Sequence, residues 1–169
     1  MQKALYDIFA AKMMGICLRY VSDRESARDL LQEGFIKVYT NFKAYSETGS
    51  LEGWMRRIFV NTALEHMRKN DVLRNSSELD VFNQNAFVDP NKTILEHLST
   101  NELMEIICGL PAGYRTVFNL FVIEGYSHKK IAQLLNITEG TSRSQYVRAK
   151  QILQKKLTLM DNKLKAKVV

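Results

Sequence analysis

The sequence predicts an all-α fold in which an N-terminal helical bundle and a C-terminal helix-turn-helix domain are joined by a flexible linker. Apolar residues recur at the 3.6-residue helical period over most of the chain. Residues 71–92 lose this period and are rich in Asn, Ser and Asp, which is typical of a linker. Charge is also uneven, with a net +3 over residues 1–70, −3 over 71–98 and +6 over 99–169. We therefore predict a bundle at 1–70, a linker at 71–92, a helix-turn-helix domain at 93–160 and a basic tail at 161–169.

Three helices are expected in the N-terminal bundle. The first spans residues 2–21, and the second opens with a capping box in which Ser22 and Glu25 satisfy each other's backbone donors. The third runs from Leu51 to about residue 70, after a loop over residues 45–50 that contains Gly and Ser. The apolar stripes are Leu5, Ile8, Phe9, Met13, Ile16, Cys17 and Tyr20 on the first helix, Ala27, Leu30, Leu31, Val38 and Phe42 on the second, and Leu51, Trp54, Met55, Ile58 and Met67 on the third.

Two other faces of this bundle lie outside its apolar stripes. One is a polar face on the second helix, and the other is a stripe on the third helix that contains two arginines, an asparagine and a leucine. Because Trp54 lies on the apolar stripe of the third helix, we assign it to the core. The polar face consists of Arg28, Asp29, Gln32, Glu33 and Lys37, and the separate stripe of Arg57, Asn61, Leu64 and Arg68.

Helical patterning resumes after the linker, where a short helical piece is expected near Leu79–Phe82. Helices are predicted at about residues 93–108 and 112–124, with a break at Gly109-Leu110-Pro111. Pro111 suits a helix start, because the N–H that it lacks would have no intrahelical partner.

A helix-turn-helix follows over residues 125–150. Ser127 can cap its first helix, whose apolar stripe is Ile131, Leu134 and Leu135. Asn136 is a plausible left-handed stop because Asn tolerates positive φ, and Thr138 can cap the second helix. The pattern predicts two short helices separated by a three-residue turn, which is the layout that places one helix in a DNA major groove.

The second of these helices has a core face and a free face. Ser142, Tyr146, Ala149 and Leu153 share the core face by the helical period. The free face carries Ser144, Val147, Arg148, Gln151 and Lys155, flanked by Arg143 and Gln145. Such side chains can read base edges and contact phosphates, and the chain carries 10 basic against 2 acidic residues from Ser127 onward. The alternative is an ordinary helical hairpin with a solvated charged face.

Several classes of protein are excluded by what the sequence lacks. No apolar run approaches the 18 residues of a transmembrane helix, and no secretory or lipidation motif is visible. Cys17 and Cys108 lie in apolar helical patterns, which favours core packing in a reducing cytoplasm. His66, His97 and His128 are scattered. We therefore expect no metal site, no cofactor, no small-molecule substrate and no enzymatic activity.

Motifs in order along the chain resemble those of the extracytoplasmic-function (ECF) sigma factors of bacterial RNA polymerase. Residues 18–21 and 27–35, LRYV and ARDLLQEGF, are similar to the family's polymerase-docking region 2. Residues 54–61, WMRRIFVN, are similar to its promoter-melting helix. Residues 110–118 and 124–127, LPAGYRTVF and EGYS, resemble the opening of region 4, and residues 139–149 resemble its recognition helix.

This resemblance implies roles for residues in both domains. Core polymerase would be bound at its β′ clamp helices by Asp29, Gln32 and Glu33, and the β flap would be a further contact. The −10 element would be melted and bound by Tyr45, Arg57, Asn61 and Arg68. The −35 duplex would be read or gripped by Arg143, Ser144, Gln145 and Arg148. The partners implied are core RNA polymerase, promoter DNA and a membrane-anchored anti-sigma factor.

Two features depart from the family pattern. The chain begins at Met1 inside the segment that resembles the family's first helix, where members usually have an extra N-terminal helix. Lys130 stands three residues after Ser127, where members often carry a Glu that closes a capping box. Lys129 and Lys130 oppose the helix macrodipole at a cost of a few tenths of a kcal/mol each. We hypothesise that DNA phosphate near Lys130 offsets this cost.

The function expected is that of a cytoplasmic initiation factor that binds core RNA polymerase and directs it to specific promoters. The chief alternative is a stand-alone helix-turn-helix regulator that acts as a dimer on duplex DNA. A protein that sequesters another factor, and an RNA-binding role, are further alternatives. A flexible linker would let two weak DNA-binding units act together through effective concentration.

Overall fold

The computed structural model describes residues 2–21, 23–69 and 100–167, and these residues form helices and short connections without a β-strand. The chain divides into two compact units, Met1–Leu73 and Arg74–Val169. The predicted linker, its short helical piece at Leu79–Phe82 and the predicted helix start at residue 93 lie outside the described residues. The all-α prediction is confirmed, and the two units are described separately below.

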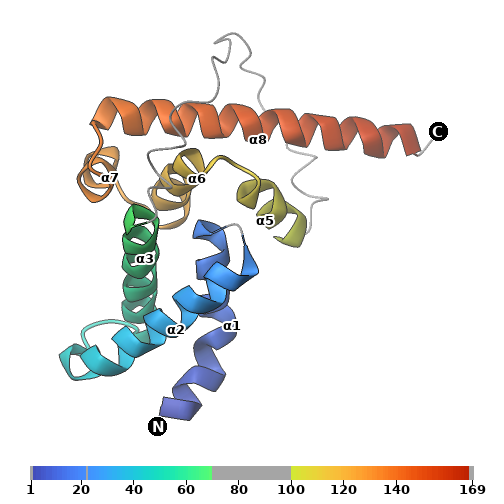
Figure 1. Cartoon of the computed structure of the whole chain (residues 1–169). Coiled ribbons are helices and arrows are strands. Elements are labelled where there is room, and N and C mark those ends of the chain that lie inside the picture. Colours follow the sequence, from blue (N-terminus) through green and yellow to red (C-terminus); the bar gives the residue numbers. More distant parts are fainter. Residues whose placement is uncertain (1, 22, 70–99, 168–169) are drawn as a thin grey trace. The chain divides into compact units, whose positions relative to one another are not determined.

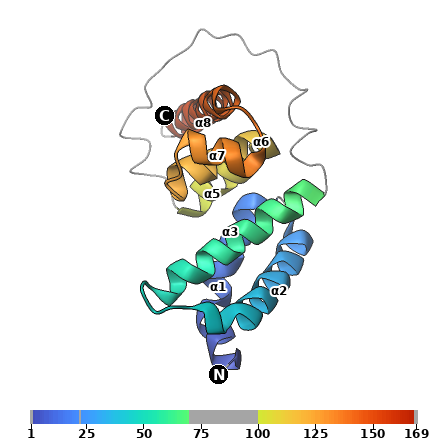
Figure 2. The ribbon, with the colours of Figure 1, turned by 90° about the vertical axis from the view of Figure 1, so that its left-hand side faces the viewer.

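The N-terminal unit is a bundle of three long helices and one short one. They are α1 (Gln2–Tyr20), α2 (Arg24–Asn41), the 3-10 helix η1 (Phe42–Ala44) and α3 (Leu51–Lys69). Each long helix packs against the other two, as Figures 1 and 2 show. The largest fully buried side chains of this core are Met13, Tyr20, Leu30, Val38, Met55, Phe59, Val60, Leu64 and Met67. Burial raises the pKa of the Cys17 thiol to about 12, as suits a core cysteine that stays protonated.

The N-terminal cap of α2 differs from the predicted capping box. Asp23, in an extended conformation, is the cap residue, and its Oδ1 accepts a hydrogen bond of 2.7 Å from the backbone N–H of Ser26. That hydrogen bond lowers the pKa of the Asp23 carboxyl. The prediction of a Ser22 cap is therefore wrong by one residue, because a carboxylate one position later is equally suited to cap a helix.

Three assignments of apolar residues also need correction. Ile8 is 66% exposed, because it lies half a turn around α1 from the buried Cys17. Leu64 is fully buried, although its sequence position groups it with the exposed Arg57 and Arg68. The buried arc of α3 is wide because α1 and α2 both pack on it. Trp54 is only half-buried and lies outside the fully buried core.

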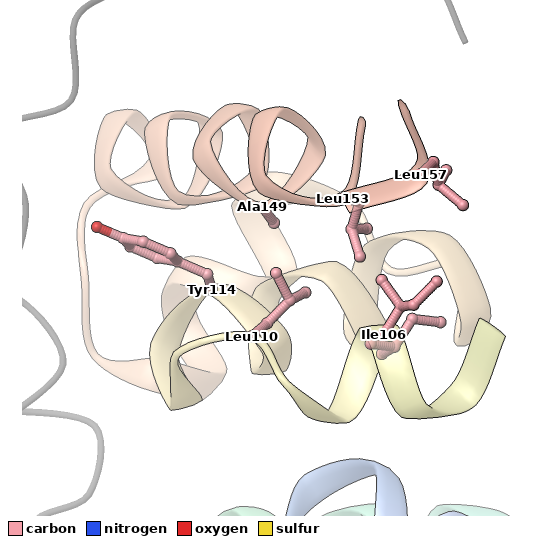
Figure 3. Packing of buried hydrophobic residues seen from close by; sticks show 7 residues of the cluster. Ile106, Leu110, Tyr114, Ala149, Leu153 and Leu157 are labelled. Carbon is pink, nitrogen blue, oxygen red and sulfur yellow. The ribbon is translucent and has the colours of Figure 1, made fainter. Parts of the chain in front are cut away.

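The C-terminal unit is organised by one long helix. Its elements are α5 (Thr100–Cys108), α6 (Ala112–Phe118), the π-helical segment η3 (Asn119–Ile123), α7 (His128–Leu135) and α8 (Glu139–Lys167). Figure 1 shows α7, α6 and α5 following one another along one side of α8. A core cluster joins α5 and α6 to α8 (Figure 3), and it contains Ile106, Ile107, Leu110, Tyr114, Ala149, Leu153 and Leu157. Helix α8 continues through residues 161–167, which the sequence analysis assigned to a basic tail.

Two cations tie α5 to its neighbours at its C-terminal end. The buried Arg115 of α6 donates from Nη1 to the carbonyl oxygen of Cys108 at 2.7 Å. Lys156 of α8 donates from Nζ to the carbonyl oxygen of Gly109 at 3.1 Å. The last carbonyls of a helix carry partial negative charge, so both contacts are electrostatically favourable. Burial lowers the pKa of the Arg115 guanidinium, which nevertheless remains a cation at any physiological pH.

A glycine sets the spacing between α2 and α3, and its replacement by alanine tests this packing. A Cβ added at Gly34 would lie 2.3 Å from the Phe59 ring, so Gly34→Ala forces that ring to move. We expect a loss of about 1–3 kcal/mol in the free energy of unfolding, the usual cost of overpacking a core. Chemical denaturation followed by circular dichroism measures it. Gly15→Ala is the matched control, since a Cβ at Gly15 of α1 meets nothing within 4 Å and should stabilise its helix by about 0.5–1 kcal/mol.

Candidate DNA-binding and partner-binding surfaces

Three side chains that the sequence identified shape the helix-turn-helix: one caps the start of α7, and two lie in the turn between α7 and α8. Ser127 Oγ accepts from the Lys130 backbone N–H at 3.2 Å, and Thr138 Oγ1 accepts from the Thr141 backbone N–H at 3.0 Å. Between these two caps, Asn136 adopts a left-handed conformation with φ of 54°. The predicted three-residue turn is confirmed, and it fixes the direction in which α8 leaves α7.

The buried face of α8 matches the predicted core face. Ser142, Ala149 and Leu153 are buried and Tyr146 is half-buried. The opposite side leaves Arg143, Ser144 and Arg148 exposed, whereas Gln145 is half-buried. Lys130 is exposed in the first turn of α7. The structure therefore brings the three exposed candidate −35 residues of α8 to one solvent-facing side, with Gln145 at its edge.

Both candidate arginines of α8 are already engaged by neighbouring side chains. Arg143 Nη2 lies 2.5 Å from Glu139 Oε1, one helical turn earlier. Arg148 Nη1 donates to the Tyr114 hydroxyl of α6 at 3.1 Å. Neither the Arg143–Glu139 contact nor the Arg148–Tyr114 contact was predicted, although residues 139–149 were assigned to the recognition helix. The i,i+4 spacing of an acidic and a basic residue signalled the first contact, whereas the second joins residues far apart in sequence.

An aromatic cluster packs against the core-facing side of α8 near its N-terminus. The His128 ring stacks on Phe121 with centroids 4.3 Å apart, and both rings contact Tyr146. His128 Nδ1 shares a hydrogen bond of 2.9 Å with Oγ of the fully buried Ser142. Burial, and then the charge of Arg143, lower the pKa of His128, while Glu139 opposes them. The cluster links η3, the start of α7 and the exposed turn of α8.

The candidate −10 residues of the N-terminal unit lie on α3 and on the loop before it. Arg57, Asn61 and Arg68 are exposed along one side of α3, and Arg68 Nε donates to the carbonyl oxygen of Leu64 at 3.3 Å. Tyr45 is half-buried, and its hydroxyl donates to the carbonyl oxygen of Gly49 at 2.5 Å. The Tyr45 ring also packs 5.4 Å from that of Trp54. The loop is therefore held against the start of α3.

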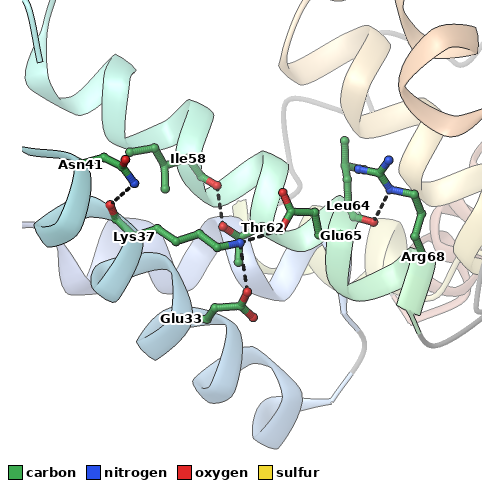
Figure 4. Close-up of polar contacts among 8 residues, drawn as sticks. All are labelled: Glu33, Lys37, Asn41, Ile58, Thr62, Leu64, Glu65 and Arg68. Atoms are coloured by element: carbon green, nitrogen blue, oxygen red, sulfur yellow. Dashed lines mark hydrogen bonds and ion pairs between the residues drawn. The ribbon is translucent and has the colours of Figure 1, made fainter. Parts of the chain in front are cut away.

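The candidate polymerase-binding residues form a polar face on α2. Asp29 and Gln32 are exposed and Glu33 is partly exposed. Lys37 Nζ bridges Glu33 Oε1 at 3.0 Å and Glu65 Oε2 of α3 at 2.7 Å, as drawn in Figure 4. Burial lowers the pKa of Lys37, but the two carboxylates raise it by more. This bridge orients the Glu33 carboxylate and couples α2 to α3, a link that the sequence pattern did not reveal.

Among the residues that the structure describes, no three His, Cys, Asp or Glu side chains gather as a metal site would require. None of the described helices has both the length and the apolar character needed to cross a bilayer.

Comparison with known proteins assigns the chain to a family. Residues 5–72 match the family model of sigma-70 region 2, and residues 100–153 match that of sigma-70 region 4. The ECF RNA polymerase sigma-E factor of Haemophilus influenzae is 30% identical over 155 residues, with 86% of this chain and 82% of the relative covered. The chain belongs to the ECF family of RNA polymerase sigma factors.

A further relative agrees with this assignment, and a solved structure shares the fold. The ECF RNA polymerase sigma factor SigW of Bacillus subtilis is 27% identical over 162 residues, covering 90% of this chain and 87% of the relative. The sigma factor RpoE of Bartonella quintana, solved in complex with the anti-sigma factor NepR, aligns with a TM-score of 0.53 and 22% identity over 94% of this chain and 97% of that one. The similarity to the Bartonella quintana structure shows that the two chains share a fold.

Family membership makes this protein a transcription initiation factor that directs RNA polymerase. The alternative of a stand-alone dimeric regulator is not favoured. The matched relatives are sigma factors, a class of protein that is not enzymatic in itself.

The depressed pKa of His128 predicts a pH-dependent stability of the C-terminal unit. A histidine that folds into a site favouring its neutral form contributes stability above its unfolded pKa, near 6.5, and loses it as the pH falls through the folded pKa. We therefore expect the unfolding temperature to fall between pH 7.5 and pH 5.5, and part of this fall to be absent in His128→Gln.

Thermal unfolding followed by circular dichroism at several pH values measures this effect. His66→Gln, in the N-terminal unit, is the control and should keep the fall seen in the wild type. Identical pH profiles for wild type and His128→Gln would contradict the prediction.

Proposed function

We propose that this sigma factor binds core RNA polymerase through its N-terminal unit and recognises promoters through both units. The observation that carries the proposal is the exposed side of α8, where Arg143, Ser144 and Arg148 gather on a helix held by a helix-turn-helix. An Arg in such a position can bind guanine through two hydrogen bonds, and a hydroxyl can bind bases or phosphate. Gln145 lies at the edge of this surface and would contribute from there.

The polymerase contact is proposed for the polar face of α2. Asp29, Gln32 and Glu33 would contact the β′ clamp helices, with the carboxylates complementing a basic partner surface and setting register and association rate. The β flap would provide a contact for the C-terminal unit. Lys37 supports this role indirectly, because its bridge to Glu33 and Glu65 leaves Glu33 pre-oriented.

The −10 contact is proposed for α3 and the loop before it. Arg57, Asn61 and Arg68 form an exposed polar stripe that can contact the backbone of melted DNA. Tyr45 offers an aromatic face for an unstacked base, although its hydroxyl and ring are both held within the loop. A held ring loses less conformational entropy on binding than a free one.

The remaining parts of the proposal follow from the family. The protein would act in the cytoplasm without catalysing a reaction, and a membrane-anchored anti-sigma factor would hold it inactive. In vitro transcription tests the proposal directly: core polymerase, this protein and a pool of genomic promoters are mixed, and transcript starts are sequenced. Starts that share two spaced motifs are expected, and starts without shared motifs would contradict it.

The polymerase-binding face can be tested apart from DNA binding. Asp29→Asn combined with Glu33→Gln removes one exposed and one partly exposed charge from α2 while preserving side-chain size. We expect binding to core polymerase to weaken by about 10-fold or more, mainly through a slower association rate. Surface plasmon resonance on immobilised core polymerase measures this rate. Glu52→Gln, which removes an exposed charge on α3, is the control and should bind like the wild type.

Lys130 gives a second test, in which stability and DNA binding should change in opposite directions. Lys130 occupies the N3 position of α7 after the Ser127 cap, so Lys130→Glu completes a capping box. We expect a higher unfolding temperature, by a gain of about 0.5–1 kcal/mol, together with weaker promoter binding by the holoenzyme. Thermal unfolding and filter binding measure the two effects, and unchanged promoter binding would refute the role of Lys130.

A further inference from the structure

Glu139 is an acidic residue at the start of α8, in a strongly basic part of the chain. It is the first residue of α8 and lies one turn before Arg143, to which its carboxylate is paired at 2.5 Å. From Ser127 onward the sequence holds ten basic residues and two acidic ones, of which Glu139 is the first and Asp161 the second. A carboxylate at the N-terminal end of a recognition helix lies where base edges are contacted in helix-turn-helix complexes.

Helix stability alone does not account well for this arrangement. An exposed i,i+4 ion pair contributes only about 0.3–0.5 kcal/mol, and both side chains here are substantially exposed, at 44% for Glu139 and 64% for Arg143. Glu139 also gains from the positive end of the helix macrodipole, but a neutral hydrogen-bonding residue would avoid its repulsion of DNA phosphate. The repulsion between this carboxylate and phosphate weakens binding to every DNA sequence. Such a loss is useful if one sequence forms a hydrogen bond with the carboxylate and therefore loses less affinity than the others.

We propose that Glu139 is a specificity-determining residue for −35 recognition, acting together with Arg143. The inference rests on the proposed function of α8. A carboxylate accepts a hydrogen bond from the N4 amino group of cytosine, and a guanidinium donates two to O6 and N7 of guanine. The Glu139–Arg143 pair therefore presents an acceptor and a donor fork side by side, which suits a G·C base pair or two adjacent G·C pairs.

The pair also restricts the Arg143 side chain before DNA arrives. An unrestrained arginine can turn to the nearest phosphate, which contributes affinity without sequence preference. The ion pair with Glu139 keeps the Arg143 guanidinium over the first turn of α8. On the core-facing side of that turn, the buried Ser142 shares a hydrogen bond with His128, whose ring stacks on Phe121. Loss of the carboxylate should therefore broaden sequence preference, and binding to disfavoured −35 sequences should become stronger.

The test uses holoenzyme and a promoter library in which the −35 element is randomised and the −10 element is fixed. Transcripts are counted for wild type, for Glu139→Gln, which has the same shape without the charge, and for the control Glu105→Gln. Glu105 is exposed on α5, which packs against α8 near Leu153 and Leu157, several helical turns away from Glu139. Circular dichroism establishes that each variant is folded as the wild type is.

We expect the wild type to prefer G·C by about 10-fold at one or two −35 positions, a factor that matches the 1–3 kcal/mol of a good base contact. In Glu139→Gln this preference should fall to about 3-fold or less, while output from disfavoured sequences rises. Glu105→Gln should give the wild-type profile. An equal change for every −35 sequence, or an unchanged profile, would overturn the inference. A wild-type holoenzyme without any −35 preference would instead overturn the proposed function.

Discussion

The buried face of α8 is the constraint on which the C-terminal unit depends. Ser142 and Ala149 are small and fully buried, so α6 and α7 can approach α8 closely, while Leu153 and Leu157 fill the space against α5. A helix buried along one side has its remaining side chains fixed in direction by the 3.6-residue period. Arg143, Ser144 and Arg148 are therefore exposed together, because burial of the core residues fixes the rotation of α8 about its axis. The same packing that stabilises the unit also defines the surface that we propose faces DNA.

The division into two units suits a protein that must recognise two DNA elements and a polymerase at once. Each unit has its own buried core, and the polar surfaces proposed for binding are the α2 and α3 faces in one unit and the start of α8 in the other. Small polar surfaces bind weakly alone, but tethering makes the second contact intramolecular and raises its effective concentration. Under the proposed function, weak individual contacts are an advantage, since neither unit would occupy DNA in the absence of polymerase.

Local chemistry explains which features could be predicted from the sequence. Ser127, Asn136 and Thr138 act through backbone bonds to residues within four positions, so their roles are visible in a short window. Leu64 and Trp54 were misplaced because their burial depends on which helices pack on α3, and periodicity does not contain that information. The Arg148–Tyr114 contact and the Lys37–Glu65 bridge were missed for the same reason, since each joins helices that only the fold brings together.

Several charged residues of the proposed α2 and α8 surfaces share a property that helps to explain how selective binding arises. Arg143 is paired with Glu139, Arg148 with Tyr114, and Glu33 with Lys37. Each contact fixes a long side chain that would otherwise lose conformational entropy on binding, and each also offers an internal partner with which DNA or polymerase must compete. An incorrect partner, whose geometry is poorer, does not displace the internal contact. A correct partner either displaces the internal contact or forms hydrogen bonds in addition to it. Pre-paired charges thus lower affinity for all partners and lower it most for incorrect ones, which is the behaviour required of a factor that selects start sites.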